Sequence, residues 1–176
     1  MICPSCSHDN IAGVEVCDEC GQSLSEAYKN WGSGEFQEIF AEPLSVLGLR
    51  PPVCVVPTTS LAEVISLLKG KNVGCVLVTG DLGELVGIFT ERDVLYRVAG
   101  LIRNLEQITV ESLMTARPTV LNADTAIQHA LHLMSIHGFR HVPLVNAADK
   151  PVGIVSFRDI VGFIERNFTP GVQMGV

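Results

Sequence analysis

The sequence has no long hydrophobic run and few aromatic residues, which make up 6% of the chain. Its apolar segments, such as residues 53–56 and 75–78, are far shorter than the roughly 20 residues that a membrane-spanning helix needs. The first residues include Cys, Pro, Ser and Asp, whereas a secretory signal needs a basic start followed by an apolar stretch. We therefore expect a soluble, cytoplasmic protein.

The sequence is also short of positive charge. It has 12 Lys and Arg against 19 Asp and Glu, which gives a formal net charge of −7 at pH 7. Such a chain is repelled by nucleic-acid phosphates and by anionic membranes. It also lacks a Gly-rich phosphate loop with its Lys, and it shows no nucleophile paired with a general base. We therefore expect neither an enzyme nor a general nucleic-acid-binding protein.

Two Cys-x-x-Cys pairs lie near the N-terminus and contain Cys3, Cys6, Cys17 and Cys20. Two such pairs supply the four thiolates of a tetrahedral zinc site, and the short segment between them needs the metal in order to fold. The segment resembles the short zinc ribbons found at the ends of many prokaryotic proteins. We predict a structural zinc ribbon over residues 1–24, with a rubredoxin-like iron site or a redox-active dithiol as the alternatives.

The predicted ribbon is acidic, which favours docking onto a protein rather than onto nucleic acid. Because four cysteines already complete the metal shell, His8 is expected to be an exposed loop residue. Residues 25–49 are expected to form a linker that contains a helix, since Phe36, Ile39 and Phe40 share one face. Trp31, Phe36 and Phe40 are expected to pack on the main domain.

The rest of the chain contains an internal repeat. Adding 66 to a residue number aligns the two copies without a gap, and it pairs Gly87 with Gly153, Arg92 with Arg158, and Asp93 with Asp159. The hydrophobic fraction of 47% with few aromatics favours parallel or mixed sheets covered by helices. The copies, residues 50–104 and 105–170, are predicted as two β-α-β-β-α units of an α/β (α+β) fold.

Each copy has the same expected order of elements. Extended segments at 53–56 and 119–121 lead to Thr59 and Thr125, which are expected to cap helices. The strands that follow are expected at 75–78 and 86–89, and again at 142–145 and 152–155. Second helices are expected to begin near residues 92 and 158.

Several side chains in these elements carry their own predictions. Cys54 and Cys75 lie in apolar strand segments and are expected to be buried. His129, His132 and His137 are expected on the exposed side of a helix. His129 and His132 have the spacing of metal ligands, but no acidic third ligand lies near them in the sequence.

The repeats resemble CBS domains. "GIFTERD" at residues 87–93 and "GIVSFRD" at 153–159 are similar to the family's Gly-hydrophobic-x-Thr/Ser-x-x-Asp signature, and "LMTARPTVLNADT" and "FRHVPLV" resemble its other segments. The similarity covers residues 44–167. It implies a Bateman module, which is a pair of CBS repeats with clefts for AMP, ADP, ATP or S-adenosylmethionine.

The signature also has a physical meaning. Asp93 and Asp159 fall in a first helical turn, where a carboxylate can accept hydrogen bonds from the two hydroxyls of a ribose. Thr90 and Ser156, with the helix N-terminus, can donate to a phosphate. The alternative is that each Asp only caps its helix.

Basic residues make the two copies unequal. Arg92 and Arg158 are present in both, but Arg140 and His141 precede a strand of the second copy where the first has Gly74 and Cys75. The resemblance implies that such basic residues face ligand phosphates. We therefore predict that the Asp159 site binds phosphate better than the Asp93 site.

Together these features predict a non-enzymatic regulatory sensor that binds an adenine nucleotide. The alternatives are a transcription-associated protein whose ribbon contacts nucleic acid, and a structural interaction module with empty clefts. The resemblance also implies a homodimer, for which the helices after Asp93 and Asp159 supply an apolar surface. The candidate residues of that surface are Val94, Leu95, Val98, Ile160, Val161 and Ile164.

Overall fold

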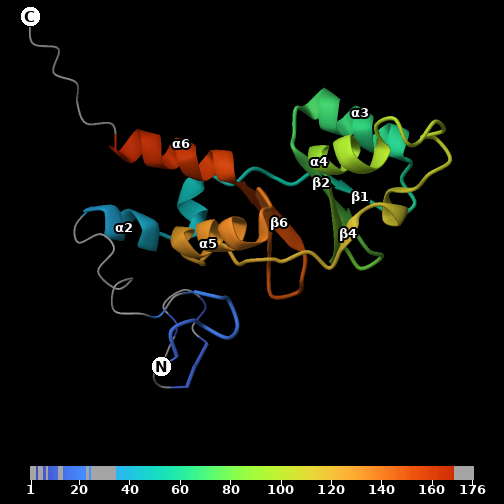
Figure 1. Cartoon of the computed structure of the whole chain (residues 1–176). Helices are drawn as coiled ribbons and strands as arrows, with labels where there is room; N and C mark the ends of the chain where they lie inside the picture. Colours follow the sequence, from blue (N-terminus) through green and yellow to red (C-terminus); the bar gives the residue numbers. More distant parts are fainter. Residues whose placement is uncertain are drawn as a thin grey trace, which may run out of the picture. The chain divides into compact units, whose positions relative to one another are not determined.

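The protein is described by a computed structural model over residues 3, 6, 8–11, 14–22, 24 and 35–168 (Figure 1). Trp31 and the side chain of Phe36 lie outside the described residues. The chain divides into two compact units. The ribbon-bearing unit comprises Met1–Gly48, Ala123–Arg140 and Val155–Val176, and the sheet unit comprises Leu49–Asn122 and His141–Ile154.

The sheet unit is built on a four-stranded sheet with the order β1-β2-β3-β4. β1 runs parallel to β2, whereas β2 and β3, and β3 and β4, are antiparallel. The strands are β1 (Cys54–Val55), β2 (Cys75–Thr79), β3 (Leu85–Thr90) and β4 (Thr115–Ala116). α3 (Leu61–Lys71) contributes Leu61 and Val64 to a core with Val76, Val78 and Phe89.

The second sheet contains β5 (His141–Val145) and β6 (Pro151–Ser156). Leu121 forms a parallel bridge to Leu144, which is the counterpart, 66 residues later, of the Val55–Val78 pair between β1 and β2. The remaining elements of the sheet unit are α4 (Glu91–Asp93), the π-helix η2 (Val94–Val98) and the 3-10 helix η3 (Val110–Ser112). The predicted duplication of β-α-β-β-α is therefore confirmed.

The segment that leads into each repeat lies against the other repeat. β4 lies in the leading segment of the second copy but pairs with Gly87 and Ile88 of the first, and Arg50, at the start of the first copy, bridges to Ile154 of the second. Side chains of these leading segments also pack on the other repeat. The sulfur of Met114 occupies the space that a Cβ on Gly87 would need, and the Leu49 Cβ lies 3.3 Å from the Cβ position of Gly153.

The ribbon-bearing unit contains α2 (Glu35–Ala41), the 3-10 helix η1 (Leu44–Leu47), α5 (Ile127–His137) and α6 (Phe157–Phe168). α5 packs against both α2 and α6, and α6 packs against η1. The Leu44 N–H donates to the Thr125 carbonyl (2.8 Å) and the Ile127 N–H to the Glu42 carbonyl (2.9 Å). The predicted helix in the linker is therefore present as α2, and Phe40 is half-buried.

The predicted caps of the first helices are displaced by one residue. Ser60, not Thr59, precedes α3, and its Oγ accepts from the Glu63 N–H at 3.2 Å. Ala126 precedes α5 and makes no side-chain cap. A cap must be the extended residue directly before the first helical one, and local spacing does not fix that position to one residue.

No helix in the described part of the chain has the length and apolarity that a bilayer crossing requires.

Candidate functional site

Asp93 and Thr90 close a ring of hydrogen bonds at the start of α4. One oxygen of the Asp93 carboxylate, Oδ2, accepts from the Thr90 N–H (2.9 Å) and from the Thr90 hydroxyl (2.7 Å). The Thr90 Oγ1 accepts in turn from the Asp93 N–H at 3.3 Å. This is a capping box, and it satisfies N–H groups that the first helical turn leaves without a partner.

Asp159 and Ser156 repeat the same ring at the start of α6. Oδ2 of Asp159 accepts from the Ser156 N–H (2.9 Å) and hydroxyl (2.5 Å), and the Ser156 Oγ accepts from the Asp159 N–H (3.2 Å). In both boxes the hydroxyl proton is committed to the carboxylate. Phosphate donors at these positions would therefore be backbone N–H groups and arginines rather than Thr90 or Ser156.

The two carboxylates differ at their second oxygen. Oδ1 of Asp93 lies 3.4 Å from Nε of Arg97, one helical turn onward, and Arg97 also donates to the Leu113 carbonyl at 2.7 Å. Among the described residues, Oδ1 of Asp159 has no hydrogen-bond or ion-pair partner. Only the second box therefore presents an acceptor that its own surroundings leave open.

The helices behind the boxes also differ. After three α-helical residues the first copy widens into the π-helix η2 and ends at Val98, whereas α6 continues as an α-helix for 12 residues. The N-terminus of a helix attracts an anion, and α6 is the one of the two helices that continues regularly behind its box.

Arg140 lies beside the second box. Its carbonyl accepts from the Phe157 N–H at the start of α6 (2.9 Å), just as the Gly74 carbonyl accepts from the Glu91 N–H at the start of α4 (3.0 Å). The Arg140 side chain is exposed, as is that of Arg158, and both extend from residues next to the box. The equivalent of Arg140 in the first copy is Gly74, which has no side chain.

His141 lies with the first copy rather than the second. A Cβ on Gly74 would meet its Nε2 at 2.5 Å, so the ring covers the Gly74 backbone, whose carbonyl binds the N-terminus of α4. Arg140 lies just before β5 begins, and its carbonyl binds the start of α6 while the His141 ring lies on Gly74. The structure thus brings Thr90, Arg92 and Asp93 together near His141, and Ser156, Arg158 and Asp159 together near Arg140.

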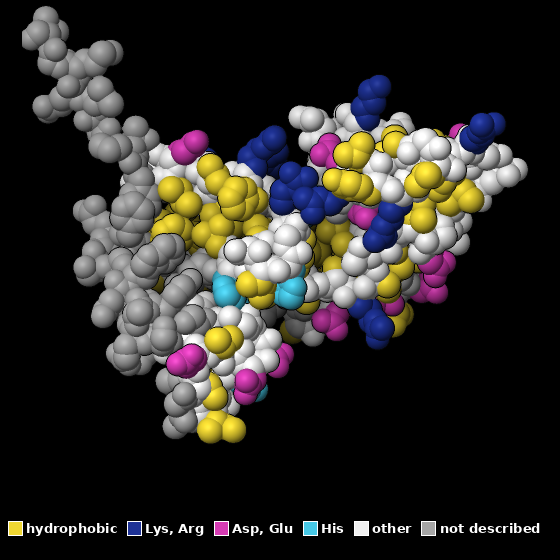
Figure 2. All heavy atoms as spheres, viewed as in Figure 1, with side chains coloured by type: hydrophobic (Ala, Val, Ile, Leu, Met, Phe, Trp, Pro, Cys, Tyr) yellow, Lys and Arg dark blue, Asp and Glu magenta, His cyan; other side chains and the backbone are white. Residues whose placement is uncertain are grey.

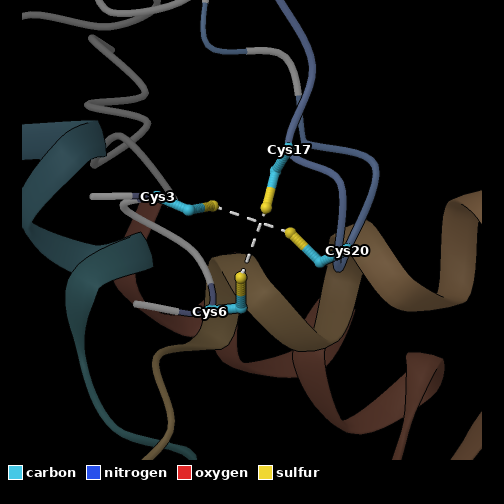
Figure 3. A group of neighbouring side chains, drawn as sticks. All are labelled: Cys3, Cys6, Cys17 and Cys20. Carbon is cyan, nitrogen blue, oxygen red and sulfur yellow. Dashed lines mark hydrogen bonds between the residues drawn. The ribbon is translucent and has the colours of Figure 1, made fainter. Parts of the chain in front are cut away.

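The four N-terminal cysteines converge on one point (Figure 3). The Sγ atoms lie within 4.8 Å of one another, and the Cys3–Cys20 and Cys6–Cys17 pairs are each 3.6 Å apart. A tetrahedral zinc ion with Zn–S bonds of about 2.3 Å needs sulfur separations of roughly 3.8 Å. All four cysteines are free of disulfides, so the donor set and its spacing fit zinc.

Burial and hydrogen bonds affect these thiols differently. Burial raises the pKa of Cys6 and Cys20. It acts in the same direction on Cys17, but the backbone N–H of Cys20 and the side chain of Asn10 outweigh it and lower the pKa of Cys17 to about 6. Several thiolates this close repel one another, and a cation among them removes that repulsion.

Two residues of the metal region have roles that the sequence did not reveal. Asn10 is buried and connects the two knuckles, because its Oδ1 accepts from the Asp18 N–H (2.9 Å) and its Nδ2 donates to the His8 carbonyl (3.0 Å). His132 contacts the Cys20 carbonyl. An Asx-turn preference hints at the first role, but no local pattern indicates the second.

Three predictions about single side chains were wrong. His129 is only 7% exposed and His132 is half-buried, since α5 is covered on more sides than an edge helix would be. Cys54 is exposed because it lies on the outward face of β1, a strand of only two residues. Cys75 is buried as expected, and burial raises its pKa to about 12. His8 is exposed as expected.

Comparisons with known proteins agree with this architecture. The profile of the family described as "CBS domain" matches residues 47–100 and 110–166. A 17.7 kDa protein of Acidianus ambivalens is 35% identical over 120 residues, which cover 68% of this chain and 71% of that one. Some relatives are much longer, and the chain spans only 16% of a 32% identical protein from Schizosaccharomyces pombe.

Two similar solved structures contain adenosine compounds. The CBS domain protein PAE2072 from Pyrobaculum aerophilum, complexed with AMP, is 29% identical with a TM-score of 0.61 and covers 66% of this chain and 88% of that one. The CBS domain pair of protein MJ0100 is in complex with 5′-methylthioadenosine and S-adenosyl-L-methionine. It is 26% identical with a TM-score of 0.63, covering 69% and 98%.

Proposed function

Because this chain belongs to the CBS domain family, we propose that it is a non-enzymatic sensor that binds an adenine nucleotide or S-adenosylmethionine. Similar structures with AMP and with S-adenosylmethionine support this class of ligand. The observation that carries the proposal in this chain is the open Oδ1 of Asp159, on a carboxylate whose Oδ2 is already fixed by Ser156.

The fixed carboxylate suits a ribose. Since two hydrogen bonds hold Oδ2, the side chain does not lose rotamer freedom when Oδ1 accepts from a sugar hydroxyl. The N-terminus of α6 and the exposed guanidinium groups of Arg140 and Arg158 attract the phosphates. An adenine nucleotide carries both groups, which makes it a better match than a free sugar or a free phosphate.

The first copy is proposed as the weaker site. Thr90, Arg92 and Asp93 are arranged in the same way, and the ring of His141 lies nearby on Gly74. However, Arg97 occupies the second oxygen of Asp93, so a ribose there must displace an ion pair. That displacement reduces the gain in free energy on binding.

The cysteine cluster is proposed to hold a structural zinc ion through Cys3, Cys6, Cys17 and Cys20. When bound, the ion fixes the two knuckles, which lack a core large enough to fold unaided. The described ribbon residues include the exposed acidic side chains of Asp9, Glu15, Asp18 and Glu19, which are suited to a basic surface on an unidentified protein partner.

A homodimer remains a prediction, with a changed surface. Val98 and Ile160 are buried within the chain, so they are not available for contact with a second copy. Leu95 and Tyr96 are exposed on η2, and apolar side chains are visible around α4 and the segment after it (Figure 2). We propose that this part of the first copy, rather than the residues around Ile160, contributes to the dimer.

Calorimetric titration of the full chain with AMP, ADP, ATP and S-adenosylmethionine, followed by native mass spectrometry, tests the proposal. We expect at least one ligand to bind, and a hundredfold excess over its Kd to raise the free energy of unfolding by about 2.7 kcal/mol. Arg140→Ala is expected to reduce the preference among ligands for those with more phosphates. If no adenosine compound adds mass, heat or stability, the nucleotide sensor is excluded.

The capping boxes support a second candidate, a structural interaction module without a ligand. Both Asp carboxylates already satisfy their own helix, which is sufficient to explain why an Asp stands at each position. The titration separates the two functions, because a purely structural module gives no ligand-dependent change while it remains folded.

A further inference from the structure

The second knuckle of the ribbon contacts α5 through a hydrogen bond. Nε2 of His132 lies 2.9 Å from the carbonyl oxygen of Cys20. A carbonyl oxygen can only accept, so Nε2 carries the proton and donates it. His132 therefore holds the backbone of a residue whose thiol belongs to the metal site.

A second contact lies one helical turn away on the same face. A Cβ on Gly21 would lie 3.9 Å from Cδ1 of Ile136, so the turn after Cys20 is in van der Waals reach of that side chain. His132 and Ile136 are four residues apart and therefore share a face of α5. His129, three residues before His132, is buried on the same side. His132 and Ile136 therefore define the side of α5 that faces the ribbon.

The apolar core formed by the described ribbon residues is small. Its cluster of buried apolar residues consists of Cys3, Cys17, Cys20 and Leu24, with Cys6 and Val14 partly buried. Such a cluster is too small to stabilise a fold without a metal. A donor fixed on a packed helix restricts the Cys17–Cys20 knuckle before metal binds and so favours the bound geometry.

We propose that His132 is a positioning residue for the metal centre and that α5 is the docking face of the metal-loaded ribbon. Metal binding by the ribbon and docking of the ribbon on α5 are then coupled. Such coupling is reciprocal. If docking increases the metal affinity by some factor, bound metal increases the docking equilibrium constant by the same factor. The inference rests on the zinc part of the proposed function and is independent of nucleotide binding.

The test compares full-length, zinc-loaded wild type with His132→Ala, His132→Gln and His137→Ala. Gln places an amide donor near the position of Nε2 and serves as the conservative variant. His137→Ala is the matched control, because His137 lies on α5, is exposed, stacks on Phe139 and points about 140° away from His132.

Two measurements are made: the rate of zinc transfer to a colorimetric chelator, and hydrogen exchange of α5 before and after zinc removal. His132→Ala is expected to release zinc up to ~10-fold faster, while His132→Gln and His137→Ala stay near wild type. In wild type, zinc removal should increase exchange in α5 and leave α3 unchanged.

Equal release from His132→Ala and wild type, or exchange in α5 that does not respond to zinc, overturns the inference while the zinc site stands. Native mass spectrometry of the wild type comes first. If it holds no metal under saturating zinc, the zinc part of the proposed function fails and this inference fails with it.

Discussion

The two capping boxes share one hydrogen-bond pattern and differ in what surrounds it. Thr90–Asp93 and Ser156–Asp159 close the same ring, with each Oδ2 accepting from the N–H and the hydroxyl of its partner. Around the first ring are Gly74, a π-helix and Arg97; around the second are Arg140 and a regular α-helix. The signature residues therefore secure the helix start, and their neighbours decide whether a ligand can use it.

The largest expected effect is on nucleotide affinity. Asp159→Asn keeps an acceptor for the Ser156 groups but removes the charge at the open oxygen. Since a hydrogen bond to a charged group contributes about 1.5–3 kcal/mol, affinity should fall about tenfold or more. Asp93→Asn should leave the stronger site unchanged, and calorimetric titration of both variants measures the difference.

The opposite result would reverse the comparison. If Asp93→Asn abolishes binding while Asp159→Asn keeps it, the first copy is the ligand site and the Arg97 ion pair is not an obstacle. Unfolding curves of both variants show whether any loss of affinity is a loss of fold.

An intermediate effect is expected on stability. Thr90→Ala and Ser156→Ala each remove one capping hydroxyl, and each should lower the free energy of unfolding by about 1 kcal/mol, as measured by urea denaturation. Similar losses would show that the two boxes stabilise their helices equally, so that any difference in ligand binding comes from their surroundings. A loss at only one box would contradict the structural equivalence of the pair.

The smallest expected effect is on the pH dependence of the unfolding free energy, and it comes from a residue of the second copy. Burial, with a smaller contribution from His132, lowers the pKa of His129 below its ordinary 6.5. The unfolded chain then binds more protons than the folded one near pH 6, so stability falls as pH decreases through 6.5. The equivalent residue of the first copy is Glu63, which is exposed.

His129→Leu should therefore flatten the dependence of unfolding free energy on pH between 5 and 7, measured by urea titration in zinc-containing buffer. Glu63→Gln is the matched change in α3 and should leave that slope unaltered. A slope that survives in His129→Leu assigns the effect to other groups.

The sequence was sufficient for the features that depend on local spacing. The 66-residue offset, the strands around Val76 and Val142, and the Thr90 and Ser156 helix starts all follow from periodicity and capping chemistry within a few residues. The four cysteines converge as predicted because two short knuckles leave few other arrangements.

Features that depend on tertiary contacts were not predictable. Whether Cys54 faces inward depends on a strand of only two residues, and a shift of one residue reverses the face. The contact of His132 with Cys20 joins residues 112 positions apart, and nothing near either residue indicates it. The sequence also did not indicate that the His141 ring lies on Gly74 of the first copy rather than beside the Asp159 box of the second.

The segment at the start of each repeat packs on the other repeat, so the two halves of the chain depend on each other. Gly87 is covered by Met114 and Gly153 by Leu49, so each half brings the piece that completes the other. A fragment cut between the halves would expose a bare glycine and an unpaired strand edge, and would associate with a complementary fragment or with another copy of itself.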